Sequence, residues 1–187
     1  MQYPFIHHPG DGQTTIVGSK SSPIHPQNTS AVPLSVRSAA QRGWRIFPIY
    51  ARSKHAMGAA TMIAEATCDL VQLEDWANQH SDCGWAVATG HASGVLAVEM
   101  KGAEGIAAFT FLVLDNEYDE MMQHALISQT GYGEAETIYV YFRWPADFGM
   151  CHHLRGTIAP GLRLHGEGGY ALLPTHISGM SHSWLVY

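Results

Sequence analysis

The sequence predicts an α+β (α/β) domain, in which short helices and short strands alternate along most of the chain. The chain has 187 residues, which is enough for one full-sized domain with its own core. Hydrophobic residues make up 46% of the chain and charged residues 14%, so a disordered chain and a coiled coil are excluded. Strand-like alternation is interleaved with helical spacing, and 19 glycines punctuate the chain.

The amino-terminal segment differs in composition from the rest. Residues 1–31 are rich in Gly, Ser, Thr, Pro and His and have no hydrophobic period, which predicts a flexible arm ahead of a single domain over 32–187.

The three cysteines are odd in number and show no CxxC spacing, as is typical of proteins of a reducing cytoplasm. No apolar stretch approaches the ~20 residues of a membrane helix, so we expect no membrane partner.

Two helices and three strands are predicted in the first half of this domain. Apolar residues recur at helical spacing after Pro33, and Gly43 is a natural end for that helix. Asp69 is a good N-cap for a second helix. The segment 51–66 is predicted to be a loop. The predicted helices cover 34–42 and 70–80, and the predicted strands cover 44–50, 84–88 and 95–98.

The second half begins with two predicted helices. Residues 103–114 are almost entirely apolar, which predicts a buried helix, and residues 116–126 predict a helix with an acidic outer face. Residues 137–143 (TIYVYFR) alternate and are rich in β-formers, which predicts a strand. Further strands are predicted at 161–164, 170–173 and 184–187 in one carboxy-terminal sheet, with a glycine-rich turn over 166–169 joining the first two.

Charge is unevenly distributed along the chain. The formal net charge is −6, which argues mildly against a protein that binds nucleic acid over its whole surface. Five of the ten basic residues fall within 37–54, whereas acidic residues gather within 115–136. We therefore expect any polyanion to meet the basic segment or a local site.

Six segments in a fixed order carry a family resemblance. They are GWRIFP (43–48), the capped Trp76 helix, GWAVATG (84–90), SGVLAVEMKGAEG (93–105), YVYFRWP (139–145) and APGLRLHGEGGYALLP (159–174). In this order the chain resembles the N-terminal domain of bifunctional DNA primase/polymerases, of the archaeo-eukaryotic primase superfamily, over residues 36–187. The resemblance implies an RRM-like sheet packed against an additional α/β unit. It also implies metal-dependent nucleotidyl transfer, with Mg²⁺ or Mn²⁺, in DNA replication or in a mobile element.

The resemblance implies four active-site positions, and this sequence departs from the pattern at three of them. The family pattern is two acidic residues one apart, then a histidine, then a third acidic residue. Glu99 keeps the first carboxylate and remains a weak metal ligand, but Lys101 replaces the second. Tyr139 stands at the histidine position and Arg163 at the last acidic position. Because protonated Lys and Arg offer no lone pair to a metal, the cations predict either a metal-free phosphate site or a structural ion pair with Glu99.

Further residues are candidates for contact with a nucleotide or phosphate. The glycine turns at 89–90 and 166–169 can bring backbone amides to a phosphate, although tight turns need glycine in any case. Basic side chains after the first strand and at the end of the strand over 137–143 fit either substrate contact or a solvated surface. The candidates are Lys54, Thr89, Gly90, Arg143 and His165.

Aromatic residues and one further acid complete the candidates. Trp44, Trp76 and Trp85 are predicted to lie in the core. Trp144 follows a strand end and is predicted to be exposed, where a base could stack on it. Glu167 lies in the glycine-rich turn and is predicted to be solvated.

Three functions remain open from the sequence. The main hypothesis is a cytoplasmic primase/polymerase-like pseudoenzyme that keeps a cleft for a nucleotide or single-stranded DNA and works with replication proteins. The first alternative is an active metal-dependent nucleotidyltransferase that uses Glu99. The second is a non-enzymatic protein-interaction module, docked through the basic segment 37–54 or the acidic segment 115–120.

Overall fold

The computed structural model describes residues 30–50, 55, 57, 60–115, 122, 125–130, 136–145, 155–175 and 182–185. The predicted arm over 1–31 lies outside these residues except at its end, and so does most of the predicted helix over 116–126. The helices are α1 (Leu34–Gln41), α2 (Ala60–Glu65), α3 (Leu70–Gln79) and α4 (Gly102–Asp115). The strands are β1 (Ile46–Tyr50), β2 (Cys83–Ala88), β3 (Val95–Lys101), β4 (Leu126–Thr130), β5 (Thr137–Arg143), β6 (Arg155–Ala159), β7 (Leu162–His165), β8 (Tyr170–Leu172) and β9 (His182–Trp184).

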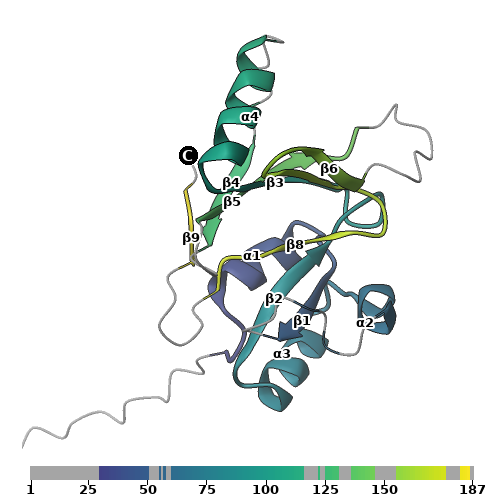
Figure 1. Cartoon of the computed structure of the whole chain (residues 1–187). Coiled ribbons are helices and arrows are strands. Elements are labelled where there is room, and N and C mark those ends of the chain that lie inside the picture. Colours follow the sequence, from purple (N-terminus) through teal and green to yellow (C-terminus); the bar gives the residue numbers. More distant parts are fainter. Residues whose placement is uncertain are drawn as a thin grey trace, which may run out of the picture.

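Two antiparallel sheets form the framework of the described residues. The smaller sheet has the order β1-β2-β8, and the larger has the order β6-β7-β3-β5-β4-β9. Helices α1, α2 and α3 lie with the smaller sheet on one side of the larger sheet, and α4 lies on the other side (Figure 1). The predicted α+β class, with a large sheet and a second α/β unit, is confirmed.

The alternation of side chains along β3 and β5 assigns each face of the larger sheet to a different core. Ala97, Tyr139 and Tyr141 pack into the cluster that includes α1, α3 and the smaller sheet. Val98, Met100 and Val140 point the other way and pack with Ile106 and Phe109 of α4. Successive residues of a strand face opposite sides of the sheet. The register between β3 and β5 therefore directs a row of polar and aromatic side chains toward the smaller sheet and its helices.

Local signals explain the elements that were predicted correctly. The Asp69 side chain accepts a hydrogen bond of 3.0 Å from the Val71 amide and caps α3, as the N-cap pattern predicted. Pro48 lies in β1, an edge strand, where a missing amide is tolerated. The tryptophans at 44, 76 and 85 are buried, which confirms that prediction.

Several element predictions were wrong. Helix α2 forms within the segment predicted to be a loop, because its Ala, Met and Glu residues favour helix even without an amphipathic period. Strand β4 begins at Leu126, where a helix was predicted to end. Strand β6 was missed because it is a half-exposed edge strand that begins Arg-Gly-Thr and lacks clear alternation.

The carboxy-terminal strands do not form one sheet. Strand β7 pairs with β3 and β9 with β4 in the larger sheet, whereas β8 pairs with β2 in the smaller one. The glycine-rich turn over 166–169 therefore carries the chain from one sheet to the other. A local turn pattern predicts a reversal of direction, but the partner of each strand depends on distant residues.

Helix α4 is not buried as predicted. Phe111 is 66% exposed and Leu114 is 70% exposed, and Figure 1 shows the end of α4 extending beyond the sheet. The sheet covers only one side of a helix that is apolar on most sides. The helix and the sheet together leave an apolar groove of about 420 Å³ between them.

Candidate functional site

A cleft opens between the larger sheet and the start of β8. Its volume is about 560 Å³. Strands β3, β5, β6 and β7 supply most of its polar side chains, and the turn before β8 closes one end. The residues lining it are Ile63, Glu99, Tyr139, Arg155, Gly156, Arg163, Leu164, His165, Gly168, Gly169, Tyr170 and Leu172.

Three candidate residues form one row across the middle of the sheet. Glu99 on β3 lies directly opposite Arg163 on β7 and directly opposite Tyr139 on β5. Residues opposite each other in an antiparallel pair share a face, so all three side chains face the cleft. The structure therefore brings together three of the four positions that the resemblance implied.

His165 holds the carboxylate of Glu99. Its Nε2 lies 2.8 Å from Glu99 Oε2, and the two side chains are 16% and 17% exposed. One of the two interpretations from the sequence was a structural ion pair of Glu99 with Lys101 or Arg163, and neither interpretation named His165 as a partner of Glu99. His165 also lies 6.0 Å from the Tyr139 ring, centroid to centroid, so the two rings flank the carboxylate.

The tyrosines of the cleft are held in their neutral form. Burial raises the pKa of Tyr139 well above its ordinary value, and the charge of Glu99 and a hydrogen bond with it raise that pKa further. Burial and Glu99 also raise the pKa of Tyr170, while Arg163 lowers it. Glu99 and Arg163 thus act on the same phenol, which places their opposite charges at one site.

Arg155 is a site residue that sequence reasoning missed. It lies on β6 opposite His165, and its Nη1 donates a 3.0 Å hydrogen bond to the Gly168 carbonyl. Arg155 and Arg163 are both exposed and both line the cleft. Arg155 is brought to the cleft by the pairing of β6 with β7, and no local pattern in the sequence indicated that pairing.

The sequence pattern and this geometry point to one family. The family model for the N-terminal domain of bifunctional DNA primase/polymerases matches residues 36–186. The chain belongs to this family. No curated protein matches the chain at a significant level.

As a primase/polymerase-like domain, the chain is related to nucleic-acid metabolism, and the family implies interaction with a nucleotide or a nucleic acid. No helix in the described part of the chain has the length and apolar character that crossing a bilayer requires.

Three of the remaining candidates lie away from the cleft or outside the described residues. Lys101 shares the face of Glu99 but is exposed at the end of β3 and, unlike Arg163, is not among the residues that line the cleft. Arg143 is exposed at the end of β5 and does not line it either. Lys54 lies outside the described residues.

Trp144 is only 9% exposed, so it was wrong to expect an exposed stacking residue there.

The backbone amides of the turn at 89–90 already donate hydrogen bonds, one to the turn at 166–169 and one to β3. The Thr89 amide donates to the Gly169 carbonyl at 2.9 Å, and the Gly90 amide donates to the Val95 carbonyl at 2.7 Å. The Thr89 hydroxyl donates to Gly166, also across the two turns. These amide hydrogens already have acceptors, so this geometry favours the structural role of Thr89 and Gly90 over phosphate contact.

The Glu167 side chain links the same two turns by a hydrogen bond. Its Oε2 accepts a 2.8 Å hydrogen bond from the His91 amide, and the residue is half-buried. The predicted solvated position is therefore only part of the description, because one carboxylate oxygen is bound by the His91 amide at a partly exposed site. A carboxylate used in this way links the two turns, and Glu167 is not among the residues that line the cleft.

The metal centre of primase/polymerases does not fit the residues of this cleft. Mg²⁺ and Mn²⁺ require several hard oxygen ligands. Among the described residues that line the cleft, Glu99 is the one carboxylate, and it faces a histidine and an arginine. Within the described residues, no group of three or more His, Cys, Asp or Glu side chains is placed to hold an ion.

Proposed function

We propose that this chain is a primase/polymerase-like domain in which catalysis is impaired. Its cleft binds the phosphate groups of a nucleotide or of single-stranded DNA without a metal ion. The observation that carries the proposal is the position of Arg163. This arginine faces Glu99 across β3 and β7, where the family resemblance expects a metal-binding acid.

The charges of the cleft support phosphate as the ligand. Arg155 and Arg163 offer ten N–H donors between them, of which one Arg155 donor is used by the Gly168 carbonyl. The carboxylate of Glu99 is engaged by His165, which limits its repulsion of an anion. Guanidinium groups bind phosphate in a bidentate manner, so fixed cations can replace the divalent ion that neutralises phosphate in the active family.

The biological context is part of the proposal. We place the domain in DNA replication or in a mobile element, beside replication proteins, because the matching family is that of bifunctional DNA primase/polymerases. A location in the cytoplasm agrees with the low cysteine content and with Cys68 and Cys83, which are free thiols.

Calorimetric titration with a deoxynucleoside triphosphate tests the proposal directly. We expect saturable binding in the presence of EDTA, because no divalent ion is needed. Arg163→Ala is expected to weaken this binding about tenfold or more, since a charge-assisted hydrogen bond contributes ~1.5–3 kcal/mol.

Arg143→Ala is the matched control for this titration. It removes the same charge from the same sheet at an exposed position outside the cleft, and we expect little change in affinity. Binding that requires Mn²⁺ would contradict the proposal and favour the active enzyme that uses Glu99. Equal affinities for Arg163→Ala and the unsubstituted protein would also contradict it.

Restoring acids at the substituted positions is expected to create a metal site. In the double variant Lys101→Asp/Arg163→Asp, a carboxylate two residues from Glu99 and another directly opposite it share one face of the sheet. We expect saturable Mn²⁺ binding in this variant and none in the unsubstituted protein, measured by electron paramagnetic resonance of free Mn²⁺.

Lys101→Asp/Arg143→Asp is the control for metal binding, because it makes the same charge change with its second carboxylate outside the cleft. Equal Mn²⁺ affinity in both double variants would show that bulk charge, and not the row at Glu99, determines binding. Strong Mn²⁺ binding by the unsubstituted protein would count against the metal-free proposal.

A protein-interaction module is the second candidate function, and helix α4 favours it. Phe111 and Leu114 are exposed beside the apolar groove between α4 and the sheet. Exposed apolar patches of this kind often mark interaction surfaces. A salt series separates the two functions, because binding of nucleic acid through cations weakens steeply with salt.

A further inference from the structure

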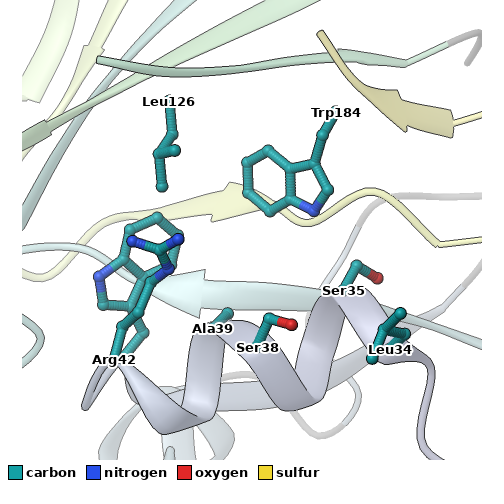
Figure 2. A pocket seen from close by; sticks show the side chains of 8 residues that line it. Leu34, Ser35, Ser38, Ala39, Arg42, Leu126 and Trp184 are labelled. Carbon is teal, nitrogen blue, oxygen red and sulfur yellow. The ribbon is translucent and has the colours of Figure 1, made fainter. Parts of the chain in front are cut away.

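A second pocket lies between α1 and the far edge of the larger sheet. Its volume is about 320 Å³, within the range of small-molecule sites. Figure 2 shows α1 as its floor, with Leu126 and Trp184 facing the helix from the strands above. We call it the α1 pocket; its lining residues are Leu34, Ser35, Ser38, Ala39, Arg42, Trp44, Leu126 and Trp184.

Aromatic rings form one side of the α1 pocket and are held in place by their neighbours. The ring centroids of Trp44 and Trp184 are 6.5 Å apart and meet edge to face. Tyr141 lies 5.5 Å from each of them, and it is fully buried. Trp184 is only half-buried and lines the pocket, so part of a preorganised indole is available to a planar ligand.

The opposite side of the pocket is polar and cationic. Ser38 lies one helical turn before Arg42 and Ser35 lies two turns before it. Figure 2 shows Arg42 at one end of the pocket and Leu34 at the other. The Ser35 hydroxyl donates to the Pro174 carbonyl, which leaves its oxygen as an acceptor. The eight described residues that line the pocket include one cation, Arg42, and no carboxylate.

We propose that the α1 pocket binds one base of a single-stranded nucleic acid, with the base against Trp184 and a flanking phosphate on Arg42. Any base can stack on an indole face. Serine hydroxyls can donate hydrogen bonds to a base edge or accept them from it, and an arginine at the rim of the pocket attracts the phosphate backbone of the nucleic acid. Arg37 and Arg45 extend the positive charge on either side of Arg42 along the chain. An aliphatic ligand would use neither the cation nor the hydroxyls.

The α1 pocket is a site separate from the cleft at Arg163. Trp184 lies in the same cross-strand row as Glu99, through Tyr139 and Ser128, but at the edge strand β9. Four strand spacings separate β7 from β9, which is about 19 Å. A mononucleotide held at Arg163 therefore does not occupy the α1 pocket, whereas an oligonucleotide can occupy both.

The inference rests on the proposed function in naming nucleic acid as the ligand, and oligonucleotide titrations separate the two. We measure the anisotropy of a labelled single-stranded oligothymidylate in EDTA. Ser38→Phe places a ring in the pocket, and we expect about tenfold weaker binding, because stacking of one base is lost. Gln41→Phe, which adds the same ring at an exposed position of α1 outside the pocket, should leave affinity unchanged.

Two milder variants keep the test valid if Ser38→Phe does not fold. Arg42→Ala should lower the magnitude of the slope of log affinity against log salt by about 0.7, the loss of one phosphate contact to a single strand. Trp184→Phe should remove the part of the fluorescence quenching that the oligonucleotide causes by stacking on this indole. An unchanged slope together with unchanged quenching would overturn the proposal.

The outcomes distinguish the two sites. If Arg163→Ala weakens mononucleotide binding while Ser38→Phe leaves oligonucleotide binding intact, the α1 pocket is not a base site and the proposed function stands. If Ser38→Phe weakens oligonucleotide binding and Arg163→Ala changes nothing, the base site stands and the metal-free cleft does not. If Ser38→Phe and Gln41→Phe weaken binding equally, the effect is not specific to the pocket and the inference fails.

Discussion

Gly161→Ala is expected to lower the free energy of unfolding by about 3 kcal/mol or more. Gly161 follows β6 with φ +68, a conformation that residues with a Cβ rarely adopt. A Cβ there would lie 2.6 Å from the Gly105 nitrogen and 2.8 Å from the Lys101 carbonyl oxygen. Both atoms belong to the backbone where β3 passes into α4, so neither can rotate away.

Two other glycines separate the clash from the backbone strain. Gly94 has φ +63 and open space around it, so Gly94→Ala should cost only about 1 kcal/mol. Gly105 is helical, where alanine normally gains up to about 1 kcal/mol, but its Cβ would lie 2.2 Å from the Gly161 carbonyl oxygen. Urea unfolding should therefore rank Gly161→Ala and Gly105→Ala well below Gly94→Ala. Equal stabilities for all three variants would contradict the close approach of α4 to the β6–β7 turn.

Tyr141→Ala is the second large effect, with an expected loss of about 3–5 kcal/mol. Tyr141 is fully buried between the two sheets, and its hydroxyl donates to the Leu172 carbonyl of β8. The same oxygen accepts from the Ser128 hydroxyl at 3.0 Å, because its single hydrogen is already used. Tyr141→Phe removes only these hydrogen bonds and should cost about 1–3 kcal/mol, measured by urea unfolding. A Tyr141→Phe variant as stable as the unsubstituted protein would show that the contact between β5 and β8 contributes nothing.

The pH dependence of stability gives a second measurement on Tyr141. Burial raises the pKa of Tyr141, and the charge of Glu99 raises it further, while the Ser128 hydrogen bond lowers it. The folded pKa lies above the unfolded value near 10, so this stabilisation is complete below pH ~10 and is lost as the pH rises further. One such group contributes a slope of up to about 1.4 kcal/mol per pH unit, and Tyr141→Phe should flatten the alkaline curve by that amount.

Glu99 was assigned to the site by the resemblance, and its surroundings were only partly predictable. The register of β3 against β5 and β7 places Tyr139 and Arg163, two further positions that the resemblance named, on either side of Glu99. The partner His165 and the second arginine, Arg155, come from β7 and β6, whose pairing involves residues far from Glu99 in the chain. Such pairings depend on the burial of whole strand faces, which no local pattern encodes.

The sequence by itself determined the α+β class, the capped helix α3 and the strand over 137–143, whereas the replacement of two acids by Lys101 and Arg163 is a prediction from the family resemblance. These features depend on local periodicity, on capping and on residue identity. Only the tertiary structure decided that Lys101 lies outside the cleft, that Trp144 is buried and that Trp184 lines a pocket with Arg42. The exposure of a side chain depends on which elements cover it, and this is set by long-range packing between two sheets that the sequence pattern does not specify.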